Sequence, residues 1–395
     1  MGFLVLKKGR ERSLLQKHPW IFSGAVEKKV GIIKNGETVD IRTIDGETVA
    51  IASYSEHSQI MARAWSFTTG QQINKAFFRK NILKSLNSRK VLNVDKNNTA
   101  YRIVNAEADE IPGLIVDKYD NYLVCQFLSS GIEFWRTEIL EILIEEFNPV
   151  GIFERSDTDS RVKEGLEKKA GLIYGEEPPT EIVIQEDGIK YCVDIKSGHK
   201  TGFYLDQREN RSKIRNYCKG MDVLNCFSYT GGFGIAALSA EANHVTNIDS
   251  SADSLKMVEK NLLLNNLDTS RSVQVEGDVF KVLRTYRDSG KSFDLIILDP
   301  PKFAESKSQL EGALRGYKDI NLLAFKLLRP GGVLFTFSCS GHIVPELFRK
   351  VVSDAAIDSG RQVQQLETLQ QSADHTILLN FSESIYLKGL VCKAW

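Results

Sequence analysis

Two short polar segments near the C-terminus each follow an apolar run that is typical of a buried parallel strand. Asp299-Pro300-Pro301-Lys302-Phe303 follows residues 293–298, and Ser338-Cys339-Ser340 follows residues 333–337. Open α/β sheets bind their ligands outside the carboxyl ends of the strands. The sequence therefore predicts one site with a carboxylate, a stiff Pro-Pro turn and a thiol, which are groups suited to chemistry on a nucleobase.

A glycine-rich turn at residues 225–234, Asn-Cys-Phe-Ser-Tyr-Thr-Gly-Gly-Phe-Gly, predicts a cofactor site between a strand and a helix. Its glycines let the backbone approach a ligand closely. The turn lacks the last interval of G-x-G-x-x-G, so S-adenosylmethionine (SAM) is favoured over a dinucleotide. Asp249 and Asp278 end the next two predicted strands, where they would bind the ribose hydroxyls and the adenine amino group. Each acid also precedes a predicted helix, so an N-cap role is the alternative.

The thiol of Cys339 decides between two methyl-transfer chemistries. Asp-Pro-Pro segments also occur in enzymes that methylate exocyclic amines, and those reactions need no covalent nucleophile. Methylation of C5 of a pyrimidine needs one, and a Cys339 thiolate would add to C6 of the ring. Asp299 would hold the N3/N4 edge of a cytosine that has left its helix or loop. The alternative for Cys339 is a buried hydrophobic side chain, as expected of Cys226 at another strand end.

The predicted site residues are grouped by role. Cys339 and Asp299 are predicted to be catalytic. Pro300, Lys302 and Phe303 are predicted to bind the substrate. Lys302 and Arg208 are candidates for contact with phosphate or the SAM carboxylate, with solvated side chains as the alternative. Glu383 is a candidate for the base that removes the C5 proton, with an acid in the turn between the last two strands as the alternative. The predicted cofactor contacts are Asp206, Arg208, Asn225, Phe227, Ser228, Tyr229, Gly231, Asp249, Asp278 and Asp299.

The composition limits the class of protein and its partners. No apolar stretch reaches the length of a membrane-spanning helix, and the N-terminus does not resemble a secretory signal. The six cysteines are scattered without a C-x-x-C pair, which argues against a metal site and favours a reducing cytoplasm. The net charge is zero, but residues 1–35 carry eight lysines or arginines against two glutamates. This basic segment either binds phosphates or is a solvated face.

The chain is expected to form three parts, at residues 1–70, 71–190 and 191–395. Short alternating segments with Asn35-Gly36 and Asp45-Gly46 turns predict a small β-barrel or sandwich in the first part, with Trp20 and Phe22 in its core. The second part is expected to be α+β, with helices at 72–86 and 132–147 and a hairpin around Asp187-Gly188. Strands and helices alternate in the third part, which predicts a Rossmann-like parallel sheet with helices on both faces.

The chain resembles the bacterial large-subunit ribosomal RNA cytosine-C5 methyltransferase I family over all three parts. The matching segments are His18-Pro19-Trp20, 198–202, 204–208, 225–232, 299–303, 315–321 and 338–341. The stretch from Lys8 to Gly24 also resembles the opening of PUA domains, which are small RNA-binding barrels.

The resemblance implies a PUA domain, a central domain, a SAM-dependent methyltransferase domain and methylation of one cytosine in 23S ribosomal RNA. It also implies that Asp206-Gln207-Arg208 lies on a hairpin close to the cofactor. Many RNA cytosine-C5 methyltransferases carry a second cysteine in the Asp-Pro-Pro region, where this chain has Lys302 and Phe303. Product release and the proton acceptor are therefore open. An amino-directed methyltransferase and a non-catalytic RNA-binding assembly factor are the competing hypotheses, and a homodimer is one option for the oligomeric state.

Overall fold

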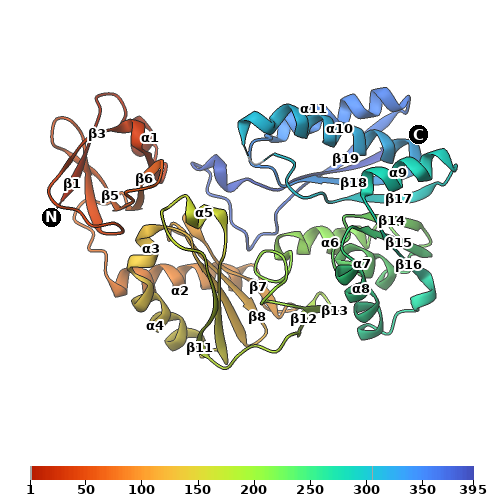
Figure 1. Ribbon diagram of the computed structural model, residues 1–395, viewed down its shortest axis with the longest axis horizontal. Coiled ribbons are helices and arrows are strands. Elements are labelled where there is room, and N and C mark those ends of the chain that lie inside the picture. The colour runs from red at the N-terminus through yellow and green to blue at the C-terminus, as the bar shows by residue number, and fades with distance from the viewer. Residues whose placement is uncertain (1, 305) are drawn as a thin grey trace. The chain divides into compact units, whose positions relative to one another are not determined.

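The computed structural model describes residues 2–304 and 306–395, with the backbone alone of residue 307. The chain divides into two compact units, each assembled from three separate segments. The first unit contains Met1–Ile184, Val193–Leu205 and Ala373–Ser384; the second contains Gln185–Cys192, Asp206–Ser372 and Ile385–Trp395 (Figure 1). The chain thus returns to the first unit after it has built most of the second. The three-part division at residues 70 and 190 stays a prediction.

The N-terminal part of the first unit is a six-stranded sheet in the order β2-β6-β5-β4-β1-β3. Inward residues such as Leu4, Ile41 and Ala52 form its own apolar core. Phe22 is 46% exposed and Trp20 is half-buried, so the prediction that both are core residues was wrong. The reason is that β2 is a short edge strand, on which Ile21 takes the inward position. The elements are β1 (Phe3–Leu6), α1 (Arg12–Leu15), β2 (Trp20–Phe22), η1 (Ser23–Ala25), β3 (Val26–Val30), β4 (Thr38–Arg42), β5 (Thr48–Tyr54) and β6 (Ile60–Ser66).

The rest of the first unit is built on a five-stranded sheet in the order β11-β10-β9-β8-β7. Apolar residues of α2 and α4 share one core with the strands. The predicted helix at 132–147 is two helices separated at Trp135, and β11 was not predicted. The elements are α2 (Lys75–Val91), β7 (Ala100–Asn105), η2 (Ala106–Asp109), β8 (Leu114–Tyr119), β9 (Tyr122–Phe127), α3 (Ser130–Phe134), α4 (Arg136–Phe147), β10 (Gly151–Ser156), α5 (Asp159–Val162) and β11 (Lys169–Gly175).

The hairpin predicted around Asp187-Gly188 is confirmed as β12 (Ile182–Glu186) and β13 (Ile189–Val193). Both turn residues have positive φ, 47° for Asp187 and 85° for Gly188. This is the backbone geometry that makes Asp-Gly a strong hairpin signal.

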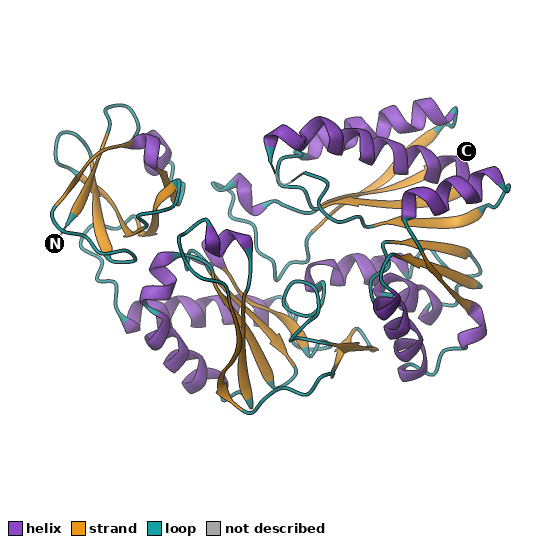
Figure 2. Cartoon of the chain, viewed as in Figure 1, coloured by secondary structure: helices purple, strands orange, loops and turns teal. Residues whose placement is uncertain are grey.

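The second unit is built on a seven-stranded sheet in the order β16-β15-β14-β17-β18-β20-β19. Strands β14 to β18 form the predicted parallel part of the sheet, whereas β20 is antiparallel to both β18 and β19. Helices cover both faces, as Figures 1 and 2 show, with α9 to α11 on one face and α6 to α8 on the other. The strands are β14 (Asp222–Cys226), β15 (His244–Asp249), β16 (Ser272–Glu276), β17 (Phe293–Leu298), β18 (Leu328–Ser338), β19 (Val363–Gln370) and β20 (Lys388–Ala394).

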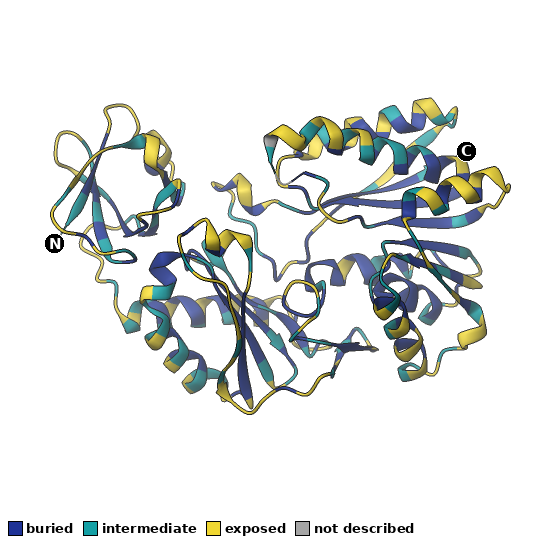
Figure 3. Cartoon of the chain, viewed as in Figure 1, coloured by how far each residue is buried: buried dark blue, intermediate teal, exposed yellow. Residues whose placement is uncertain are grey.

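Burial in the second unit follows its layers. The central strands β14, β17, β18 and β20 are mostly buried, whereas the edge strands β16 and β19 and the outer faces of the helices are more exposed (Figure 3). A single apolar core joins the strands to α9, α10 and α11. No helix in the described part of the chain is long and apolar enough to cross a membrane. The helices are α6 (Arg208–Ile214), α7 (Gly232–Ser239), α8 (Ala252–Leu264), α9 (Val279–Asp288), α10 (Leu310–Leu327) and α11 (Pro345–Ser359), with short η3 (Leu205–Gln207), η4 (Thr269–Arg271), η5 (Lys307–Gln309) and η6 (Ser382–Ser384).

Candidate active site

The glycine-rich turn between β14 and α7 has an unusual backbone. Phe227, Tyr229 and Gly231 all have positive φ, at 57°, 48° and 82°. Such angles are rare for aromatic residues, cost about 1–3 kcal/mol each, and persist only where the surrounding structure enforces them. Strained backbone of this kind concentrates at ligand sites.

Tight packing enforces this backbone. A Cβ on Gly231 would lie 2.9 Å from Cγ2 of Val258 on α8, so only glycine fits. Asp249, at the end of β15, accepts hydrogen bonds from the Tyr229 N–H at 2.8 Å and the Ser251 N–H at 2.9 Å. Since Ser251 is the N-cap of α8, Asp249 is not the helix cap and instead braces the turn.

Two other predicted cofactor contacts have structural partners. Asp278 is exposed and caps α9, because its Oδ1 accepts from the Lys281 N–H at 3.0 Å. Asn225 is buried and donates from Nδ2 to Oδ1 of Asn247 at 2.9 Å. That contact lies beneath α7, since a Cβ on Gly234 would meet the same Asn247 oxygen at 2.4 Å. The cofactor roles of Asp278 and Asn225 stay predictions.

Asp206 and Arg208 lie on η3 and at the start of α6, so the hairpin implied for this segment by the resemblance was wrong. Both side chains are almost fully buried. Asp206 accepts a hydrogen bond from the Tyr386 hydroxyl at 2.8 Å, and its backbone carbonyl accepts from the Ser372 N–H at 2.8 Å. Asp206 therefore links the start of α6 to the segment that leads into β20.

The structure brings Asp299 and Cys339 together at the carboxyl ends of two neighbouring strands. Strands β17 and β18 are parallel neighbours, with Leu298 paired to Thr336, so both polar segments leave the sheet together. The thiol of Cys339 lies 3.8 Å from the carbonyl oxygen of Pro300. Cys339 is half-buried, whereas the other five cysteines are buried. Burial raises the pKa of the Cys226 thiol, which suits that cysteine for an apolar structural role.

Aromatic rings support the Asp-Pro-Pro loop. The Phe303 ring lies 4.6 Å from that of Tyr317 on α10 and 5.8 Å from that of Phe280 on α9, measured between centroids. Tyr317 is fully buried, and its hydroxyl lies 3.2 Å from Oγ of Ser340. Tyr317 thus holds both loops. Its only advance signal was its place in a segment that carries the family resemblance. Pro300 is buried, whereas Lys302 is exposed.

Lys388 is a site residue that the sequence analysis missed. It is 4% exposed, and its Nζ donates to the carbonyls of Ser340 and Tyr386 at 2.7 Å each. The available signal was a lone cation inside the apolar run at residues 385–391.

Glu383 lies on η6, in the connection between β19 and β20, and belongs to the first unit. Its Oε2 lies 3.4 Å from Nε2 of His18. Glu383 therefore lies between the last two strands, as the alternative for this residue stated. Its role as a base stays a prediction.

Comparison with known proteins identifies the family of the chain. A family model described as S-adenosylmethionine-dependent methyltransferase matches residues 167–375, and a PUA-like domain model matches residues 4–67. "Ribosomal RNA large subunit methyltransferase I" from Tolumonas auensis is 51% identical over 392 residues, which cover 99% of each chain. The protein of the same name from Shewanella amazonensis is 49% identical with the same coverage. The chain belongs to the ribosomal RNA large subunit methyltransferase I family.

Solved structures show the same fold over the whole chain. A Streptococcus mutans protein assigned as a SAM-dependent methyltransferase aligns with a TM-score of 0.86, 24% identity and complete coverage of both chains. A second solved chain, assigned as a methyltransferase and complexed with SAH, aligns with a TM-score of 0.87 at the same identity and coverage. The expected fold of a PUA-like N-terminal domain followed by a SAM-dependent methyltransferase domain is therefore confirmed, and SAM is the cofactor of this family.

The glycine-rich turn fits the cofactor of this methyltransferase family. Gly231 leaves no space for a side chain, and the hydroxyls of Ser228 and Thr230 are buried without a hydrogen-bond partner among the described residues. Buried polar atoms normally find a partner, so these hydroxyls are suited to a ligand. No group of three or more His, Cys, Asp or Glu side chains in the described ranges is arranged to hold a metal ion.

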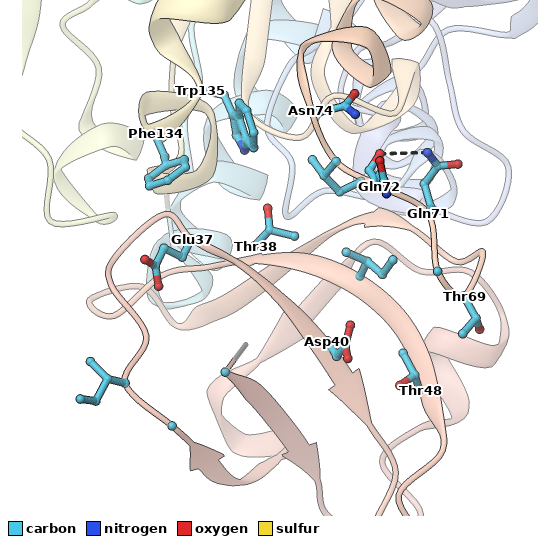
Figure 4. Close-up of a pocket in the computed structure, with 16 residues that line it drawn as sticks. Glu37, Thr38, Asp40, Thr48, Thr69, Gln71, Gln72, Asn74, Phe134 and Trp135 are labelled. Carbon is cyan, nitrogen blue, oxygen red and sulfur yellow. Dashed lines mark hydrogen bonds between the residues drawn. The ribbon is translucent and has the colours of Figure 1, made fainter.

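A separate cavity of about 1010 Å³ lies within the first unit of this methyltransferase. Figure 4 shows Phe134 and Trp135 on one side of it and Glu37, Thr38 and Asp40 of the N-terminal sheet on the other. Among the described residues that line it, the charged ones are acidic. An acidic lining repels phosphates, which argues against this cavity as a binding site for RNA.

Proposed function

We propose that this protein methylates C5 of a cytosine in 23S ribosomal RNA, with Cys339 as the covalent nucleophile. The names of its relatives, which match over their whole length, support large-subunit ribosomal RNA as the substrate. The observation that carries the C5 chemistry is the half-buried Cys339 thiol beside the carbonyl of Pro300. The free cysteines of the chain and an RNA substrate of this kind support a cytoplasmic location.

In the proposed reaction, the Cys339 thiolate forms a bond to C6 of the cytosine, and the C5=C6 electron pair moves toward C5 and the ring. SAM, held by the glycine-rich turn, would supply its electrophilic methyl group to C5 as the sulfur–methyl bond breaks and S-adenosylhomocysteine leaves. Loss of the C5 proton then restores the double bond, the bond between sulfur and C6 breaks, and Cys339 leaves as the thiolate. Covalent catalysis of this kind replaces one difficult step by easier ones.

Asp299 and its loop would hold the target base during this sequence. The carboxyl group lies at the end of β17, next to the strand that carries Cys339. It would accept a hydrogen bond from N4 of cytosine, and when protonated it would donate to N3. The stiff Pro300-Pro301 turn and the Phe303 ring packed on Tyr317 would keep this group in place. The base must leave its helix or loop to reach them.

Incubation with ribosomal RNA that contains 5-fluorocytidine tests this proposal. A base can remove hydrogen from C5 as a proton but cannot remove fluorine, so the enzyme cannot be released. The adduct between Cys339 and the RNA should therefore persist in denaturant. Cys339→Ala should abolish both the adduct and methyl transfer while the variant still binds SAM. The buried Cys226 at the end of β14 provides the control, and Cys226→Ala should still form the adduct.

Two outcomes would overturn the proposal. Methyl transfer by Cys339→Ala, or transfer without an adduct, would indicate an amino-directed methyltransferase. The absence of any SAM-dependent transfer to ribosomal RNA would indicate a non-catalytic RNA-binding protein.

A further inference from the structure

Lys388 is the first residue of β20 and is fixed beside the turn that carries Cys339. Strand β20 runs antiparallel to β18, and Lys388 pairs with Ser338, the last residue of β18. Its Nζ donates at 2.7 Å to the carbonyl of Ser340, one residue beyond Cys339. A second bond of 2.7 Å, to the carbonyl of Tyr386, fixes the ammonium group from its own side. One buried lysine therefore bridges the two strand ends.

The charge of Lys388 is coupled to the state of Cys339. Burial lowers the pKa of Lys388 to about 8, a negative charge on Cys339 raises it, and the nearby Lys302 lowers it further. A Coulomb interaction acts equally on both partners. An ammonium group that is stabilised by a Cys339 thiolate must therefore stabilise that thiolate by the same amount.

The charges that shift the pKa of Lys388 are those of Cys339 and Lys302, and the other titratable groups around the pair are Tyr317, Tyr386 and the Asp299 carboxyl at the end of β17. Tyr317 packs from α10 with its hydroxyl near Ser340, and burial raises the pKa of this phenol, so it stays neutral. The Tyr386 hydroxyl donates a hydrogen bond to the Asp206 carboxylate at 2.8 Å. Lys302 is exposed, and solvent screens its repulsion.

We propose that Lys388 is a positioning residue that fixes the turn of Cys339 and stabilises its thiolate for attack on the base. This inference deepens the proposed function and rests on it for the role of Cys339. The thiol releases its proton to water, while Lys388 stays protonated below about pH 8. The benefit is therefore present at neutral pH and fades as the pH rises and the ammonium group loses its own proton.

The rate at which iodoacetamide alkylates Cys339 reports the fraction of this residue present as thiolate, and the measurement needs no RNA. The sulfur forms a bond to carbon as the carbon–iodine bond breaks and iodide leaves, and peptide mapping reports this at Cys339 alone. An opposite charge nearby shifts a pKa by about one unit or more. Lys388→Met should therefore slow alkylation roughly tenfold at neutral pH and move the pH profile up by about one unit. Lys388→Arg should keep the fast rate.

The matched control is Lys393→Met, on the same strand, where the ammonium group lies over the Trp395 ring. The pH profile of Cys339 alkylation in Lys393→Met should match that of the protein without substitutions. SAM binding and the melting temperature report whether each variant folds. If Lys388→Met does not fold, Lys388→Arg gives the test, because its permanent charge should remove the inflection near pH 8 from the profile.

The outcomes separate this inference from the proposed function. Superimposable alkylation profiles for Lys388→Met and the unmodified protein would overturn the role of Lys388 while Cys339 remains the nucleophile. If Lys388→Met is unfolded, the role of Lys388 is overturned when the alkylation profile of Lys388→Arg retains its inflection near pH 8. Methyl transfer by Cys339→Ala would overturn the proposed function whatever the profiles show.

Discussion

At the scale of single residues, Gly231 is the position in the glycine-rich turn that tolerates substitution least. Gly231→Ala places a methyl group 2.9 Å from Val258 in a backbone with φ of 82°. The left-handed conformation alone costs about 1–2 kcal/mol for alanine, and the contact adds to it. We expect a lower melting temperature and at least a tenfold loss of SAM affinity, measured by calorimetry.

The control for this prediction is Gly290→Ala, which has a similar φ of 71° but open space around the added carbon. It should show the conformational cost without the loss of SAM affinity. Equal SAM affinity for the two variants would contradict a role for close packing at Gly231.

Residues whose chemistry stands out were predictable from sequence, whereas those that act through packing were not. Asp299 and Cys339 follow apolar runs, so their place at the carboxyl ends of neighbouring strands was expected and is found. The positive φ of Phe227 and Tyr229 has no sequence signal, because aromatic side chains disfavour that conformation. Lys388 was missed because a buried lysine is rare and depends on carbonyls that only the fold brings to it.

At the scale of elements, the hairpin of β12 and β13 is held to α6 by a buried ion pair. Arg211 donates to both carboxylate oxygens of Glu186 at 2.9 and 2.7 Å, and each residue is 3% exposed. Glu186→Gln leaves the guanidinium buried without its counter-charge, which typically costs about 3–5 kcal/mol. We expect chemical denaturation to show this loss in the free energy of unfolding.

The exposed pair of Lys219 and Glu241 in the same unit provides the comparison. Glu241→Gln should leave the denaturation midpoint unchanged, because water screens this pair. A similar midpoint for both variants would show that the buried pair does not hold the hairpin to α6.

The elements that sequence reasoning missed lack the periodicity on which it depends. Strand β11 is mostly exposed along its length and lies at a sheet edge, so no alternation marks it. Helix α6 reads as a charged surface segment, yet Arg208, Asn210 and Arg211 are buried by tertiary contacts. The Asp-Gly hairpin and the buried strands β14 and β17 were predicted because their signals are local.

At the scale of the whole molecule, residues 373–384 are the segment by which the chain returns from the second unit to the first. Arg89 donates to the carbonyl of Asp374 at 2.6 Å, and the Arg102 N–H donates to its carboxylate at 2.9 Å. The Phe381 ring packs against Trp20 of the His18-Pro19-Trp20 motif, with 4.8 Å between centroids. This motif therefore has a structural role that its local sequence did not reveal.

Phe381→Ala tests whether these contacts hold the returning segment in place. Phe381 is 4% exposed, and loss of a buried phenylalanine typically costs about 3–5 kcal/mol. We expect a lower melting temperature and faster hydrogen exchange in residues 17–22 and 373–384. Leu379→Ala, in the same segment but 98% exposed, should change neither. SAM affinity should be unchanged in both variants, because the glycine-rich turn belongs to the second unit. Unchanged exchange in residues 17–22 of Phe381→Ala would show that Trp20 is held by its bond to Glu107 instead.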